Sequence, residues 1–156
     1  MVTGVQTCAL PILEHLRLPY DEVQTSDLAE VVDKGMDEVI SKGVRNFIVD
    51  DSGLFVDALK GFPGVWSAYA QKTIGNKGIL KLMEGVEDRG AEFRCCIGCD
   101  IEGQRIIVTG ICRGTITESE TGDGGFPTGI NVKGRCIRKG IMHAFFYMFA
   151  MCIQIR

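Results

Sequence analysis

A short apolar run followed by two adjacent carboxylates is the feature that most constrains the fold of this chain. Phe47-Ile48-Val49 has the composition of a buried strand, and Asp50-Asp51-Ser52-Gly53 follows it directly. Acidic side chains at the mouth of a buried strand are costly unless a metal ion, a helix N-terminus or a cation uses them. Because ligands bind at the carboxyl ends of strands in open α/β sheets, the sequence predicts a site here. A plain strand-to-turn junction is the alternative, since Asp, Ser and Gly are ordinary turn residues.

The two carboxylates are expected to have different roles. Asp50 and Asp51 are neighbours, so on an extended backbone their side chains point to opposite faces. One of them can face a site while the other braces the loop.

The rest of the chain combines helical and strand patterns in the way that is typical of an α/β fold. Apolar side chains recur at spacings of three and four in the best helical segment, and alternation marks the strands. The elements expected are a helix over residues 26–42 capped by Ser26 and a helix capped by Asn76 that ends near Gly85. Strands are expected over residues 91–100 and 105–113, which form a hairpin with a glycine in its loop, and over residues 114–117. On the first of these strands, Cys95, Ile97 and Cys99 would share one face.

The composition indicates one soluble domain and disfavours two classes of partner. The chain has 156 residues, of which 46% are hydrophobic and 24% charged, and its net charge is −3, which favours neither nucleic acid nor a membrane. Seven cysteines are an odd number, so reduced thiols in a cytoplasmic protein are expected rather than a disulfide framework. Cys96 and Cys99 have the spacing of a metal or redox pair, but on a strand they would face opposite sides.

Two motifs that follow the apolar run resemble the signature of a known family. The first is Asp51-Ser52-Gly53-Leu54-Phe55-Val56-Asp57-Ala58-Leu59, and the second is Gly61-Phe62-Pro63-Gly64-Val65-Trp66-Ser67. Together they resemble the inosine/xanthosine triphosphate pyrophosphatases. The resemblance continues through residues 73–85, which look most like the archaeal branch, and it runs from about Leu18 to Phe126.

The resemblance implies an activity and a fold. Family members hydrolyse deaminated purine nucleoside triphosphates (ITP, dITP and XTP) to the monophosphate and pyrophosphate with Mg²⁺. They have a central mixed β-sheet flanked by helices, a cleft between two lobes, and usually a homodimeric assembly. Such hydrolysis needs a divalent ion at the phosphates, a base for the attacking water and donors for the leaving pyrophosphate.

The resemblance also assigns roles to individual residues. Asp51 matches the general base and a metal ligand, and Glu22 matches the other acidic metal ligand. Ser52, Gly53 and Phe126 match positions that contact substrate, with Gly53 allowing close approach of the backbone. Asp50 is expected to support Asp51 without touching the ion. Trp66 and Tyr69 either stack on a base or pack into the protein.

Both ends of the chain depart from the family pattern. Residues 1–12 look like the in-frame translation of a sequencing adapter and are expected to be a non-native segment before a single domain over residues 13–156. No Ser/Thr-x-Asn-x-x-Lys phosphate loop opens the chain, and the pattern is lost from Pro127 onward. One alternative hypothesis is therefore an inactive remnant of the fold that binds nucleotide weakly or only dimerises. A third is a membrane-associated protein that docks through the basic stretch before Ile141 and the apolar tail.

Overall fold

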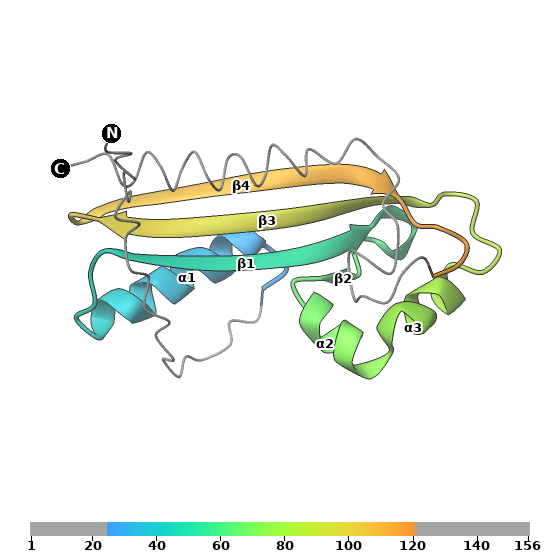
Figure 1. The fold of residues 1–156 in the computed structure, drawn as a ribbon, viewed down its shortest axis with the longest axis horizontal. Coiled ribbons are helices and arrows are strands. Elements are labelled where there is room, and N and C mark those ends of the chain that lie inside the picture. The colour runs from blue at the N-terminus through green and yellow to red at the C-terminus, as the bar shows by residue number, and fades with distance from the viewer. Residues whose placement is uncertain (1–24, 121–156) are drawn as a thin grey trace, which may run out of the picture.

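The computed structural model describes residues 25–120, which are drawn in colour in Figure 1. The elements follow in the order α1 (Leu28–Ser41), β1 (Phe47–Val56), a 3₁₀ turn (Asp57–Leu59), β2 (Pro63–Gly64), α2 (Ser67–Thr73), α3 (Gly75–Leu82), β3 (Gly90–Ile101) and β4 (Gln104–Thr115). The expectations for Glu22, Phe126 and the segments 1–12 and 127–156 lie outside the described residues. Within residues 25–120, none of the helices has the length and hydropathy that a membrane crossing requires.

The central strand β1 is much longer than the sequence predicted. It runs over ten residues and pairs with β3 along its whole length, from Phe47 opposite Asp100 to Val56 opposite Ala91. The prediction that the strand ends at Val49 is therefore wrong, and the carboxylates lie within the strand. Asp, Ser and Gly favour turns locally, but the long-range ladder with β3 overrides that preference.

The described strands form one sheet in the order β2-β1-β3-β4, and every pair in it is antiparallel. The expected α/β class is confirmed, although the sheet is not mixed over the described residues. The predicted β3–β4 hairpin is also confirmed, with Glu102 and Gly103 at positive φ in its turn. Residues 114–117 are not a separate strand, because β4 itself continues to Thr115.

The alternation of side chains along β1 gives the sheet two different faces. Phe47 and Phe55 pack with α1 in one hydrophobic cluster, while Leu54 and Val56 pack with α3 in the other. Figure 1 shows α1 and the α2–α3 pair at opposite ends of the sheet. Each face of β1 therefore packs into a separate hydrophobic cluster.

Helix α1 covers its face of the sheet through one apolar stripe. Its buried residues are Leu28, Val32 and Met36. The helix begins one residue later than predicted, because Asp27, not Ser26, is the N-cap and its Oδ1 accepts the Ala29 N–H at 2.8 Å.

The outer side of α1 is tied to the sheet by an ion-pair cluster. Arg105 of β4 donates to Asp33 at 2.6 Å and to Asp37. The Arg105 guanidinium lowers the pKa of Asp37 below its ordinary value, through a hydrogen bond first and its charge second.

Gly98 is the position that lets α1 lie close to β3. A Cβ on Gly98 would lie 2.4 Å from Met36 Sδ and 2.7 Å from Val32 Cγ1. Both neighbours are fully buried, so neither can move aside freely.

Gly98→Ala is therefore expected to lower the free energy of unfolding by about 1–3 kcal/mol through overpacking. Urea denaturation would measure this loss. In the double variant Gly98→Ala/Met36→Ala, the combined loss should be smaller than the sum of the two single losses, because the shorter side chain makes room for the methyl group. Strictly additive losses would contradict the contact.

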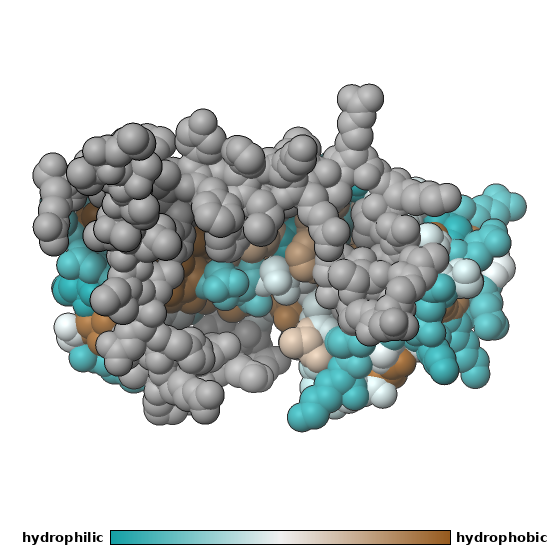
Figure 2. All heavy atoms as spheres, viewed as in Figure 1, coloured by the Kyte–Doolittle hydropathy of each residue, from teal (hydrophilic) through white to brown (hydrophobic). Residues whose placement is uncertain are grey.

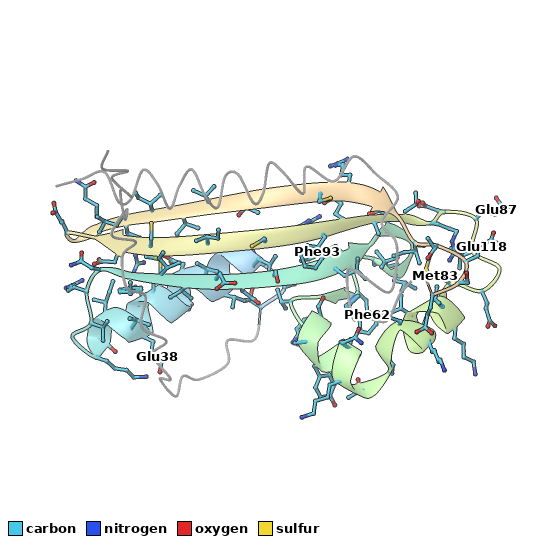
Figure 3. The ribbon with its side chains drawn as sticks, viewed as in Figure 1. Glu38, Phe62, Met83, Glu87, Phe93 and Glu118 are labelled. Atoms are coloured by element: carbon cyan, nitrogen blue, oxygen red, sulfur yellow. The ribbon has the colours of Figure 1, made fainter. Side chains whose placement is uncertain are left out.

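The other end of the sheet is closed by α3 and by one arginine. Arg89 donates to the carbonyls of Met83, Ile116 and Thr117, which joins the end of α3 to the segment after β4. Figure 3 shows Met83 and Glu118 near each other at this end, and Figure 2 shows that the surface here is mostly hydrophilic. This end is therefore a solvated surface.

Two expectations from the sequence fail in the described residues. Asn76 does not cap α3 but lies buried inside it, while Ile74 occupies the N-cap position and Gly75 adopts φ +60°. Among the cysteines of residues 25–120, Cys112 is disulfide-bonded, against the expectation of reduced thiols, which holds for Cys95, Cys96 and Cys99.

Candidate active site

Asp50 and Asp51 point to opposite faces of the sheet, as their adjacency predicted. Asp51 lies opposite Cys96 on the face that α1 covers, and it is partly buried. Asp50 lies opposite Ile97 on the other face and is exposed. The strand therefore puts the two carboxylates on opposite faces, and of the two only Asp51 is partly shielded from solvent.

The surroundings of Asp51 make its carboxylate a stronger base than an ordinary aspartate. Burial raises the pKa of Asp51, and the negative charge of Asp50 raises it further. The N–H of Ser52 donates to Asp51 Oδ1 at 2.8 Å, which opposes the rise but also fixes the carboxylate. The result is an oriented carboxylate whose pKa lies above its ordinary value.

One edge of β1 is paired with β2 only on the C-terminal side of Gly53. Strand β2 pairs only with Leu54 and Phe55, so no described strand lies beside Asp50–Ser52 on that edge. On that side, the N–H of Leu54 donates to Ser67 Oγ of α2 at 2.8 Å, and the N–H of Ser52, two residues earlier, donates to Asp51 Oδ1. The N–H of Ser52 is used by Asp51 Oδ1, and the alternation along β1 puts the Ser52 side chain on the face of Asp50 and not on that of Asp51.

Gly53 is required by the packing of β2, in addition to the substrate contact that the resemblance implies. A Cβ at this position would lie 2.2 Å from the carbonyl oxygen of Gly64 and 3.2 Å from Phe55 Cε2. The close approach that requires glycine is therefore made by the backbone of β2. The fold of the motif therefore requires glycine at position 53, whether or not Gly53 also contacts substrate.

A cavity of about 290 Å³ lies between the start of α1 and the sheet. It is lined by Ser26, Asp27, Leu28, Ala29, Phe55, Arg94, Thr109 and Ile111. Thr109 belongs to the same cross-strand row as Asp51, because Cys96 pairs with both of them. The cavity therefore borders the row that carries the candidate base.

Arg94 supplies a positive charge at the wall of this cavity. Its guanidinium carbon lies 4.2 Å from the centre of the Phe55 ring, and its Nε donates to Glu92 at 2.8 Å. Neither Arg94 nor Thr109 is among the site residues that the sequence predicted. The signal that would have found them is the register of β3 and β4, which sets both on the face of Asp51.

The described residues offer some, but not all, of the oxygen ligands that a hard cation such as Mg²⁺ takes. Residues 25–120 contain no group of three His, Cys, Asp or Glu side chains that could hold a metal ion. Asp50 and Asp51 cannot share one ion, because they face opposite sides of the sheet. A single carboxylate such as Asp51 fits Mg²⁺, which keeps several waters and takes one or two protein carboxylates.

The cysteines next to this row do not form a reactive site. Cys96 and Cys99 lie on opposite faces of β3, as predicted, which excludes the metal knuckle or redox pair that their spacing suggested. Burial raises the pKa of Cys95 to about 11, so its thiol is protonated at neutral pH. Trp66 and Tyr69 are not core residues, because their side chains are 46% and 70% exposed.

The comparisons with known proteins decide the family. The sequence model of the Ham1 family matches residues 4–129. The chain belongs to the Ham1 family. Ham1 membership covers the whole of the described region, including β1 and the cavity beside it.

Two curated archaeal relatives of this Ham1 chain carry the same name. A protein of Pyrococcus horikoshii is 46% identical over 71% of this chain, and one of Methanothermobacter marburgensis is 48% identical over 73%. Both are named dITP/XTP pyrophosphatase. The chain spans 60% and 61% of the lengths of these two proteins.

Solved Ham1 structures share the fold. The Ham1 protein of Staphylococcus aureus superimposes with a TM-score of 0.65 over 88% of this chain and 82% of that chain, at 23% identity. A HAM1 protein of Coxiella burnetii gives 0.59 over 72% of this chain and 62% of that chain, at 29% identity. The antiparallel sheet and its helices are thus a Ham1 arrangement.

Proposed function

We propose that this chain hydrolyses deaminated purine nucleoside triphosphates (ITP, dITP and XTP) to the monophosphate and pyrophosphate, and so clears them from the nucleotide pool. The observation that carries the proposal is the partly buried Asp51 on β1 of a Ham1 chain, oriented by the Ser52 N–H and with a raised pKa. The names of the archaeal relatives supply the substrate class.

In this proposal, Asp51 acts as the general base. Its carboxylate takes a proton from the water that attacks the α-phosphorus, while the bond from that phosphorus to the bridging oxygen breaks and pyrophosphate leaves. A base contributes most when its pKa approaches the working pH, so the raised pKa of Asp51 favours this role. Asp50 adds to that shift through its charge without reaching the same face.

Asp51 and Glu22 would hold Mg²⁺, which when bound neutralises the phosphate charges. Ser52 would donate to the substrate, and Phe126 would contact its purine base. Arg94, at the wall of the cavity, offers a further cation to the phosphates. A homodimer and a cytoplasmic location complete the proposal and follow the family expectation.

The deciding experiment is pyrophosphate release from ITP by the full 156-residue chain, with Mg²⁺ or with EDTA, and with GTP as the control substrate. We expect turnover of ITP that needs the ion, and far less turnover of GTP. A site that hydrogen-bonds the correct base edge rejects the wrong base by about 10⁴-fold or more. Absence of turnover with ITP, dITP and XTP would refute the activity and favour the inactive remnant.

A further inference from the structure

The hydroxyl of Ser67 joins the two segments that carry the family resemblance. Ser67 opens α2, and only 6% of it is exposed. Its Oγ accepts the N–H of Leu54 at 2.8 Å and donates to the carbonyl of Gly64 at 2.6 Å. One buried side chain thus bonds the edge of β1 and the backbone of β2 at the same time.

The carbonyl of Gly64 is also the group that approaches Gly53 most closely. It lies 2.2 Å from the position that a Cβ on Gly53 would take. Gly64 is therefore held between Gly53 on one side and the Ser67 hydroxyl on the other. Since β3 fixes the opposite edge of β1, the backbone at Gly53–Leu54 is restrained from both sides.

This restraint is the last one on that edge before the candidate site. On the N-terminal side of Gly53, no described strand pairs with β1 at the edge that β2 occupies. Ser52 is the residue immediately before Gly53, and its N–H holds the carboxylate of Asp51. The orientation of that N–H depends on how the strand is fixed at Gly53 and Leu54.

We propose that Ser67 is a positioning residue for Asp51 and Ser52. Its hydroxyl fixes the strand edge at Leu54, which sets the direction of the Ser52 N–H and, through it, the orientation of the Asp51 carboxylate. The catalytic part of this inference rests on the proposed function. Without the hydroxyl, a buried N–H and a buried carbonyl lose their partner, and the strand can relax.

The test compares Ser67→Ala with Ser67→Thr, which keeps the hydroxyl, and with Thr73→Ala. Thr73 is a matched control because, within residues 25–120, its hydroxyl in the same helix bonds to the α2 carbonyls of Tyr69 and Ala70 and not to β1 or β2. Per folded molecule, kcat for ITP should fall about 10–100-fold in Ser67→Ala with KM changed less than about threefold, because a misplaced base weakens the transition state and not binding. Ser67→Thr should restore most of kcat, and Thr73→Ala should match the wild type.

A second readout needs no substrate. In NMR spectra of the free protein, Ser67→Ala should lose hydrogen-exchange protection at the Leu54 amide and should also shift the Ser52 amide resonance. Loss of protection at Leu54 with an unmoved Ser52 amide, or unchanged kcat per folded molecule, would overturn the proposal, because Ser67 would then be structural only. If the wild type releases no pyrophosphate, the proposed function fails, while the Ser52 amide still decides whether Ser67 positions the motif.

Discussion

Asp51→Asn is expected to lower the rate of pyrophosphate release by about 10²–10⁴-fold, which is the usual contribution of a general base. The amide of Asn can still accept the Ser52 N–H that Asp51 Oδ1 accepts now, so the local geometry should persist while the proton acceptor is lost. In the wild type without bound metal, the Asp51 carboxyl should protonate above the ordinary pKa of an aspartate, because burial raises its pKa. A wild-type rate in Asp51→Asn would refute its role as the base.

The same substitution is expected to raise the melting temperature at neutral pH. A raised pKa means that the fold favours the protonated form, so Asp51 contributes stability below its unfolded pKa and loses it as the pH rises through its folded pKa. At neutral pH the ionised Asp51 therefore costs stability, which a neutral Asn does not. The difference between the two proteins should shrink as the pH falls through the raised pKa toward the ordinary one.

Thermal melts in EDTA at several pH values would measure this effect, with Asp50→Asn as the matched control. Asp50 is exposed on the opposite face, so the same chemical change there should alter the melting temperature less. A lower melting temperature for Asp51→Asn at neutral pH would contradict the raised pKa. Activity and stability are thus expected to move in opposite directions at one position.

The sequence predicted those elements whose patterns are local. The helix over residues 26–42 was found from its apolar stripe and differs from α1 only at its ends. The hairpin of β3 and β4 was found from alternation and a glycine turn, and it placed Cys95, Ile97 and Cys99 on one face, as the register confirms. Local periodicity and turn chemistry were sufficient in both cases.

The features that the sequence did not predict depend on contacts between residues that are distant in the chain. The polar residues from Asp50 to Gly53 have the composition of a turn, and only pairing with β3 keeps them extended. The role of Gly53 depends on Gly64, and that of Ser67 depends on Leu54. No periodic pattern encodes such approaches, so the candidate base was found by resemblance while its supports were not.

Gly53→Ala is expected to cause the largest loss of stability, about 3 kcal/mol or more, at the upper end of what overpacking costs. The added methyl carbon would lie 2.2 Å from the Gly64 oxygen and 2.8 Å from its carbonyl carbon. Backbone atoms cannot change rotamer, so β2 must separate from β1 at this point. That separation would also break the bonds that Ser67 makes to Leu54 and Gly64.

Gly35→Ala is the matched control, because it adds the same methyl group where there is room. Its Cβ would meet only Val49 Cγ1, at 3.4 Å, and Gly35 lies inside α1. Since glycine in a helix interior costs about 0.5–1 kcal/mol relative to alanine, this variant should be as stable as the wild type or more stable. Urea denaturation of both variants would measure the contrast. Equal midpoints for Gly53→Ala and the wild type would show that β2 does not clamp the motif, and Ser67 would then have no fixed backbone to hold.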